Sequence, residues 1–269
     1  MLRFDVNISF LFKEVPYLER FERAVAAGFG AVEFPWPGDE NLAPIKDRVH
    51  ETGLKVVLMN IDAGDLSRGE RGFLNDSTRK DWVRARSSQA IEFANLIGCP
   101  RMNVLVGNAI VGKGREEQFE QIRDTLAWIA DQAAISGIGV VVEALNSFES
   151  PHYLLTNTRD TVALLSEVNR ANLKYQYDMY HMQRMEGNLI ATLCEYIAWI
   201  GHIQIADAPE RHEPGTGEIH FPHVLALLES LGYQGYIGLE YNPTADSEQS
   251  FAWLPSDRRG EIAAADLRF

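Results

Sequence analysis

The nine residues at positions 135–143, ISGIGVVVE, contain the pattern on which the fold prediction depends. A helical stretch ends at Gly137, the chain turns, and a β-branched run follows that finishes on the carboxylate Glu143. The same order of events recurs, without close identity, in AAGFGAVEF, ETGLKVVL, LIGCPRMNV and LGYQGYIGLE. Helical stretches that alternate with short β-type runs along a chain are typical of a parallel sheet with crossover helices.

About eight such units fit in the chain, which predicts a single (β/α)8 TIM barrel over residues 1–256. The 269 residues and 46% hydrophobic content are enough for one large core. Residues 257–269 lie beyond the eighth unit, and we expect a C-terminal extension there, either a short helix or a segment that covers a neighbouring element. The expected strands are residues 4–10, 31–34, 55–61, 101–106, 139–144, 173–178, 202–206 and 236–241. The expected helices include residues 17–27, 79–97, 116–134, 161–168 and 221–231.

The composition excludes several classes of protein. The formal net charge of −13 and the pI near 5.0 oppose binding to the polyanionic backbone of a nucleic acid. No stretch approaches the roughly 20 apolar residues of a membrane helix. Asp5, Lys13 and Glu14 interrupt any N-terminal signal segment, so we expect a cytoplasmic protein. Cys99 and Cys194 lack CxxC spacing, which argues against a disulfide scaffold, a thiolate zinc site or an iron–sulfur cluster.

Four polar side chains stand at or near the ends of separate apolar runs, namely Glu143, Asp178, Gln204 and Glu240. Their separations of 35, 26 and 36 residues are close to the roughly 30 residues of one strand and one helix in an eight-unit barrel, so the four groups are expected to converge at one mouth. Three carboxylates and a carboxamide are hard oxygen ligands, which predicts a divalent cation, Mg²⁺ or Mn²⁺. The alternative is that one or two of them cap helices or pair with arginines.

Other side chains near these strand ends are candidates for contact with a substrate. His181 follows Asp178 by three residues, and its imidazole can donate to a carbonyl or hydroxyl oxygen. His202 lies at the start of its strand and is equally well explained as a core histidine. Arg71 and Arg211 occur on loops expected to overhang the metal, where a guanidinium can hold a carboxylate bidentately. Both arginines could instead be solvent-facing loop charges.

Several longer stretches carry a family resemblance. They are RFDVNISFLFKEVPYLERFERAVAAGFGAVEFPWP, AGDLSRGERG, VEALN, YQYDMYHMQRMEGNL, GHIQIADAPERHEPGTGEI and GYIGLEYNP. Together they span nearly the whole chain up to about Ser256. They resemble the hydroxypyruvate isomerase group within the xylose-isomerase-like and apurinic-endonuclease-like TIM barrels.

This resemblance implies an eight-stranded barrel and a divalent ion held by the four strand-end residues named above. It implies that Glu143 and Glu240 form the acid/base pair. It also implies substrate contacts at Glu149, His181 and Arg211, although the loop that contains Arg211 differs in length from the family pattern. The tail at residues 257–269 has no counterpart in that pattern.

The implied reaction interconverts hydroxypyruvate and tartronate semialdehyde through an enediolate, whose developing charge a divalent ion stabilises. A 2-oxo-tetronate isomerase, or a related sugar-acid or ketose isomerase or epimerase, uses the same apparatus and is the alternative. Related ketose 3-epimerases carry a histidine where Gln204 stands. A DNA phosphoesterase on this barrel is disfavoured by the acidic surface, and a sugar-binding protein would not need two glutamates beside a metal. We therefore expect an aldose–ketose type isomerase that binds a small anionic hydroxy-carbonyl substrate, and a homo-oligomer is left open.

Overall fold

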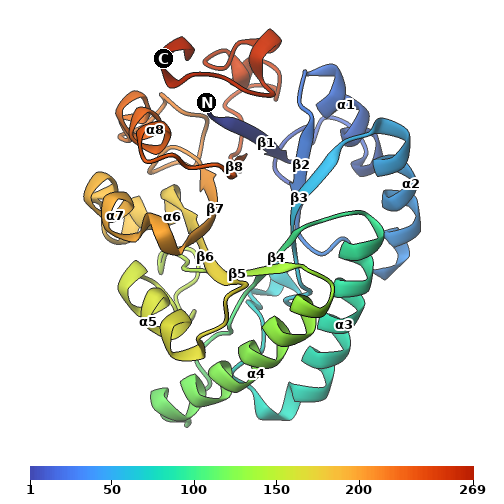
Figure 1. Ribbon diagram of the computed structural model, residues 1–269, viewed down its shortest axis with the longest axis vertical. Helices are drawn as coiled ribbons and strands as arrows, with labels where there is room; N and C mark the ends of the chain where they lie inside the picture. The colour runs from blue at the N-terminus through green and yellow to red at the C-terminus, as the bar shows by residue number, and fades with distance from the viewer.

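The computed structural model describes residues 1–269 and contains a closed barrel of eight parallel strands. Each strand pairs with the next one in the sequence, and β8 closes the ring against β1. Figure 1 shows the strands at the centre with helices around them. The strands are β1 (Arg3–Asn7), β2 (Ala31–Phe34), β3 (Lys55–Asn60), β4 (Arg101–Val104), β5 (Gly139–Glu143), β6 (Leu173–Asp178), β7 (Ile200–Ile205) and β8 (Tyr236–Leu239). The predicted (β/α)8 barrel is thereby confirmed.

A ring of helices covers the outside of the barrel. It consists of α1 (Arg20–Ala26), α2 (Leu42–Thr52), α3 (Lys80–Leu96), α4 (Arg115–Ile135), α5 (Thr158–Val168), α6 (Met179–Met185), α7 (Leu189–Tyr196) and α8 (Phe221–Ser230). The five predicted helices are present with ends shifted by a few residues. Of α2 only the end before Gly53 was predicted, and α6 and α7 were not predicted. Helix α6 has only seven residues, too few to show a clear helical period. None of the helices has both the length and the apolar composition needed to cross a membrane.

Local signals at the helix ends agree with the sequence prediction. Oδ1 of Asn157 accepts a hydrogen bond from the backbone N–H of Asp160 over 2.8 Å and caps α5. Gly53 and Gly137 end α2 and α4, and both have a φ of 69°. Glycine adopts this left-handed conformation without strain, so the chain can leave the helix and enter the next strand within a few residues.

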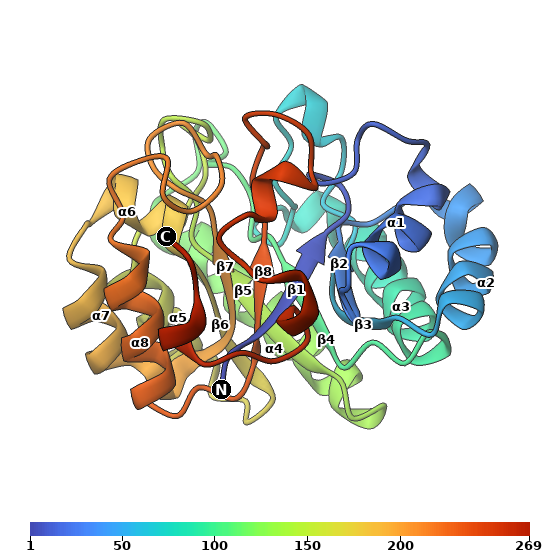
Figure 2. The same cartoon turned by 90° about the horizontal axis from the view of Figure 1, so that it is seen from above.

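The segment after β8 covers the barrel without forming an α-helix. Figures 1 and 2 show it in the gap between α8 and α1, beside β8 and β1. Ile262 and Leu2 exchange two backbone hydrogen bonds, and Trp253 packs edge-on against Phe4 with ring centroids 5.4 Å apart. The segment contains the 3₁₀ turns Gln249–Phe251, Ser256–Arg258 and Ala264–Asp266. It takes the place of an α-helix after β8; the ring still has eight helices because two of them, α6 and α7, lie between β6 and β7.

The interior of the barrel is unusually polar on one side. Asp5 on β1, Glu33 on β2 and His202 on β7 are all fully buried, and one atom of each lies within 4.8 Å of the others. Between β7 and β1 stands Gly238 on β8, where a Cβ would come within 2.6 Å of the Glu33 carboxylate. The missing side chain at this position leaves room for the charged group inside the ring.

Candidate active site

Three carboxylates from three strands converge at the carboxyl end of the barrel. Glu143 and Asp178 are the last residues of β5 and β6, and Glu240 directly follows β8. The guanidinium of Arg211 contacts the Glu240 carboxylate and lies 3.5 Å from Oδ2 of Asp178. Glu143 and Asp178 are buried, so water screens their mutual repulsion only weakly. The structure thus brings three of the four predicted ligands together near the positively charged guanidinium of Arg211.

Burial raises the pKa of each of these carboxyl groups. The pKa of Glu143 rises to about 8 because of burial and then repulsion from Asp178, and burial raises the pKa of Asp178 to about 6. The pKa of Glu240 also lies well above its usual value, chiefly through burial, and Arg211 opposes this shift. A cluster whose anionic form is destabilised in this way gains from a bound cation. The carboxylate oxygens are ligands that Mg²⁺ and Mn²⁺ prefer.

Gln204, the fourth predicted ligand, lies beside the cluster on β7. Its Nε2 donates to Oε1 of Glu33 over 2.6 Å and to Oε1 of Glu240 over 3.1 Å. Its Oε1 accepts a hydrogen bond from Nε2 of Gln176 over 2.6 Å. The amide nitrogen, and not the oxygen, therefore faces Glu240 in this arrangement.

His181 completes one wall of the cluster from the first turn of α6. Its Nε2 lies 3.5 Å from Oδ2 of Asp178 and 3.9 Å from Oε1 of Glu143. Its Nδ1 accepts a hydrogen bond from the backbone N–H of Asn146 over 3.2 Å. Burial, followed by repulsion from Arg211, places the pKa of His181 well below its usual value. The imidazole is therefore neutral, and the proton resides on Nε2, which can donate into the site.

Glu149 lies at the rim and contacts the same guanidinium. Its Oε2 is 3.4 Å from Nη1 of Arg211, and its Oε1 accepts a hydrogen bond from the hydroxyl of Tyr180. Arg184 lies 3.7 Å from Oε1 of Glu149. Glu149 thus joins two arginines above the buried carboxylates.

The loop that presents Arg211 is held in place by the carboxylate of Asp207. This carboxylate accepts hydrogen bonds from the backbone N–H groups of Gly215, Gly217 and Ile219 over 2.8 to 3.0 Å. Gly217 is required there, because a Cβ would come within 2.0 Å of the Ala208 carbonyl oxygen. A loop with this many internal bonds fixes the position of its arginine.

Arg71 is the predicted site residue that the structure leaves apart from the carboxylates. Its guanidinium donates to Oγ of Ser150 over 3.1 Å and to the backbone carbonyls of Leu66 and Glu70. Leu66 and Glu70 belong to the loop after β3 and Ser150 to the loop after β5, so Arg71 joins two loops at the rim and forms no ion pair with the cluster.

Four residues of the site were missed in the sequence. Asn7 donates to Oε1 of Glu240 over 2.7 Å, and Asn103 donates to Oε2 of Glu143 over 2.8 Å. Glu33 and Gln176 bind the two ends of the Gln204 amide, as described above. Each lies within or at the end of a barrel strand. A search for polar residues that alternate with apolar ones along each strand could have found them.

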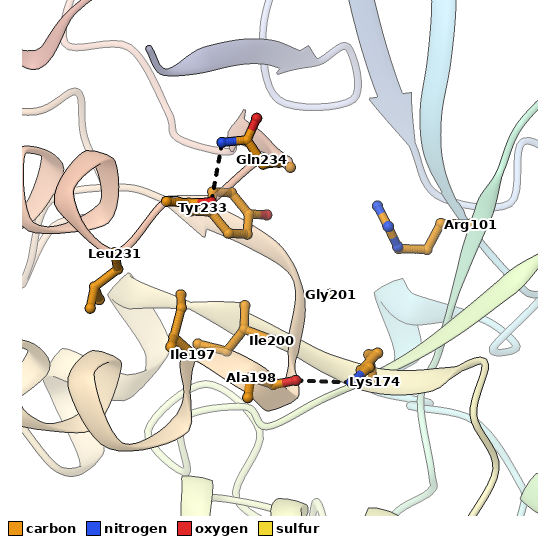
Figure 3. A pocket seen from close by; sticks show the side chains of 11 residues that line it. Arg101, Lys174, Ile197, Ala198, Ile200, Gly201, Leu231, Tyr233 and Gln234 are labelled. Carbon is orange, nitrogen blue, oxygen red and sulfur yellow. Dashed lines mark hydrogen bonds between the residues drawn. The ribbon is translucent and has the colours of Figure 1, made fainter.

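A separate hollow of about 560 Å³ lies at the opposite, amino end of the strands. Figure 3 shows Arg101 on one side of it and Tyr233 and Leu231 on the other. Lys174 donates from Nζ to the carbonyl of Ala198 over 2.9 Å at its edge. None of the lining residues is acidic, so this hollow lacks the ligand chemistry of the carboxylate cluster.

A closed (β/α)8 barrel with a buried carboxylate cluster at the carboxyl ends of its strands defines a barrel enzyme. Residues 21–256 match the family model described as xylose isomerase-like TIM barrel. The chain is therefore a member of the xylose isomerase-like TIM-barrel family.

The relatives agree with this assignment over nearly their whole length. Hydroxypyruvate isomerase of Escherichia coli strain K12 is 39% identical over 254 residues, which cover 94% of this chain and 98% of the relative. 2-Oxo-tetronate isomerase of Cupriavidus necator has the same identity and the same two coverages. These two relatives identify the chain as an isomerase. The crystal structure of AP endonuclease, family 2 from Brucella melitensis superposes with a TM-score of 0.91 at 38% identity and covers 94% of this chain and 98% of that one.

Proposed function

We propose that this isomerase interconverts hydroxypyruvate and tartronate semialdehyde with a divalent cation, Mg²⁺ or Mn²⁺, as cofactor. The observation that carries the proposal is the convergence of three carboxylates at the carboxyl end of the barrel. Glu143 and Asp178 are buried beside His181, and Arg211 joins Asp178 to the partly buried Glu240. The identity to hydroxypyruvate isomerase supports the substrate.

The donor set fits a hard divalent cation. Glu143, Asp178 and Glu240 would hold it. Gln204 would complete the set if its Oε1, which here accepts a hydrogen bond from Gln176, moved toward the cation while its Nε2 stayed on Glu33. When bound, the cation supplies a Lewis acid that stabilises the negative charge of the enediolate. The raised pKa values of the three carboxyl groups support this fit, because repulsion among buried anions favours a counter-charge.

Two glutamates are assigned to the movement of the proton. Hydroxypyruvate becomes tartronate semialdehyde when a proton leaves C3 and a proton is added at C2, while the hydroxyl proton moves from O3 to O2. Glu143 and Glu240 stand on β5 and at the end of β8, so they approach a bound substrate from different parts of the ring. One removes the C3 proton as a carboxylate, and the other delivers a proton to C2 as a carboxylic acid. His181 donates from Nε2 to a substrate oxygen.

The substrate carboxylate is assigned to Arg211. In the structure this guanidinium pairs with Glu240, Asp178 and Glu149, so it exchanges one of these partners for the substrate. Glu149 then keeps the guanidinium at the rim, and Arg71 adds positive potential from the neighbouring loop.

A 2-oxo-tetronate isomerase is the second candidate, and the equal identity to the Cupriavidus necator enzyme favours it. The two reactions share the proton transfer between adjacent carbons. They differ in chain length, which the residues around Arg211 and Glu149 would have to accommodate.

Steady-state turnover of hydroxypyruvate, 2-oxo-tetronate, D-fructose and D-tagatose tests the proposal at micromolar enzyme, with chelator and after Mn²⁺ is restored. We expect the highest kcat/KM for hydroxypyruvate and loss of turnover with chelator. A four-carbon oxo-acid preferred by more than about tenfold moves the assignment to the second candidate. A neutral ketose with the highest kcat/KM refutes the carboxylate-binding role of Arg211, and cleavage of DNA at an abasic site would refute the isomerase substrate altogether.

A further inference from the structure

Glu33 accepts hydrogen bonds from two amide groups that both contact Glu240. Nε2 of Gln204 donates to Oε1 of Glu33 over 2.6 Å and to Oε1 of Glu240 over 3.1 Å. Nδ2 of Asn7 donates to the same two oxygens, over 3.1 and 2.7 Å. Two amide bridges therefore join Glu33 to Glu240. Glu33 itself is fully buried.

The environment of Glu33 keeps its carboxylate in one position. Nε2 of His202 lies 2.7 Å from Oε2 of Glu33. Asp5 lies beside the pair, and neither of its carboxyl oxygens has another hydrogen-bond partner. Burial, followed by repulsion from Glu33, raises the pKa of Asp5 well above its usual value. Two amide nitrogens and one imidazole nitrogen therefore surround the Glu33 carboxylate within hydrogen-bond distance.

A carboxylate can only accept hydrogen bonds, whereas an amide donates at its nitrogen and accepts at its oxygen. Glu33 therefore draws the nitrogen of each amide toward itself. The same two nitrogens then donate to Oε1 of Glu240, which orients that carboxylate and leaves its Oε2 toward Arg211. Without an acceptor at residue 33, either amide could turn its oxygen toward Glu240 and repel it.

We propose that Glu33 is a positioning residue for Glu240 and that it acts through the amides of Asn7 and Gln204. The proposal rests on the proposed function, in which Glu240 moves a proton and helps to hold the cation. Partners one layer beyond a metal site typically contribute roughly 10- to 100-fold in activity or metal affinity.

The test compares Glu33→Met with Glu33→Gln. Methionine fills much of the volume but accepts no comparable hydrogen bond, whereas Gln keeps an oxygen that can serve both amides while its nitrogen donates to His202. For Glu33→Met at saturating Mn²⁺ we expect kcat to fall roughly 10- to 100-fold with KM little changed, and the dissociation constant for Mn²⁺ to rise by a similar factor. For Glu33→Gln we expect kcat and the affinity for Mn²⁺ to return most of the way to the wild-type values.

Glu186→Gln is the matched control. Glu186 also accepts two hydrogen bonds, from N and Oγ1 of Thr158 over 2.8 Å each, at the start of α5. It makes no contact with the carboxylate cluster, so this variant reports only the effect of losing a structural carboxylate. We expect its kcat and Mn²⁺ affinity to match the wild type.

Crystal structures of the wild type and of Glu33→Met provide a readout that needs no turnover. We expect both amides to contact Oε1 of Glu240 in the wild type and to leave it in the variant. Contacts that persist in Glu33→Met overturn the proposal, and so does an equal loss in Glu33→Gln and Glu33→Met. A wild type inactive toward every oxo-acid would defeat the proposed function, while these structures would still decide the positioning role.

Gly238→Ala serves if Glu33→Met does not fold. The added Cβ would lie 2.6 Å from Oε2 of Glu33 and must displace its carboxylate. We expect the same pattern of a lower kcat with KM little changed. A folded Gly238→Ala enzyme with wild-type kcat, and with Glu33 displaced in its crystal structure, overturns the proposal.

Discussion

The two ends of the barrel carry charges of opposite sign in different surroundings. At the carboxyl ends of the strands, Glu143 and Asp178 are buried beside Arg211. At the amino ends, Arg101 and Lys174 line a hollow of about 560 Å³ that contains no acidic group. The comparison teaches that the volume of the hollow at the amino ends does not show which end of the barrel is reactive. Charges held away from water mark the reactive end, because such an arrangement is destabilising unless a ligand or a partner compensates it.

The largest effect is expected from loss of the proton-transferring carboxylates. Glu143→Gln and Glu240→Gln should each lower kcat by about 100-fold or more, because an acid–base group typically contributes roughly 10² to 10⁴. The amide keeps the shape of the side chain and removes the proton acceptor. Steady-state kinetics at saturating Mn²⁺ provide the measurement, and circular dichroism checks that the fold is intact. A near-wild-type rate in either variant would remove that residue from proton transfer.

Arg211→Ala should have the next largest effect. A charged hydrogen bond to the substrate carboxylate contributes about 1.5 to 3 kcal/mol, so kcat/KM should fall roughly 10- to 150-fold, mainly through KM. Arg71→Ala is the companion variant, and its loss should be smaller because Ser150 and two backbone carbonyls already bind that guanidinium. A fall in kcat with unchanged KM for Arg211→Ala would assign Arg211 to the carboxylates and not to the substrate.

Metal binding at neutral pH should release protons from the carboxylate cluster. In the absence of a cation the pKa of Glu143 is about 8, so this carboxyl group is largely protonated at pH 7 and must lose its proton to bind metal. Calorimetric titration with Mn²⁺ at pH 7, in two buffers of different ionisation enthalpy, should reveal about one proton released per ion. Equal apparent enthalpies in the two buffers would contradict the raised pKa.

The same shift gives the metal-free protein a pH-dependent stability. The pKa of Glu143 is about 8 in the folded state, against 4.5 as its usual value in the unfolded chain. The proton is therefore bound more tightly by the folded state, and the stability gained from this is fully present below pH 4.5 and is lost as the pH rises toward about 8. The free energy of unfolding without metal should therefore decrease between about pH 5 and 8. Urea unfolding across this range tests it, and saturating Mn²⁺ should reduce the slope because the cation replaces the proton.

The smallest effect is expected at the amino end of the barrel. Lys174→Ala should leave kcat/KM within about twofold of the wild type, because surface substitutions far from a reactive site rarely exceed a few tenths of a kcal/mol. Kinetics under the conditions used for Arg211→Ala allow a direct comparison of the losses caused by removing Lys174 and Arg211. A loss as large as that of Arg211→Ala would show that the hollow in Figure 3 takes part in the reaction.

The barrel and its carboxylates could be predicted because both have a local signal. Glycine stops, β-branched runs and regular spacing place Glu143, Asp178 and Glu240 at strand ends, and parallel strands bring such ends together. Polar–apolar alternation along β2 can mark Glu33 as a candidate, but its role depends on contacts with Asn7 and Gln204 from other strands, which no local pattern reveals. The sequence left open that one or two of these carboxylates pair with arginines, and Arg211 does pair with Glu240 and Asp178. The choice of Arg211 could not be predicted, because it depends on the path of a loop fixed by Asp207.

The tail that follows β8 has a consequence for the order of events on the ribosome. Leu2 and Phe4 flank or belong to the first strand, whereas their partners Ile262 and Trp253 follow all eight strands in the chain. These contacts can therefore form only after the last strand has been synthesised. Until then the apolar side chains of the first strand lack their final cover and are open to contact with other chains.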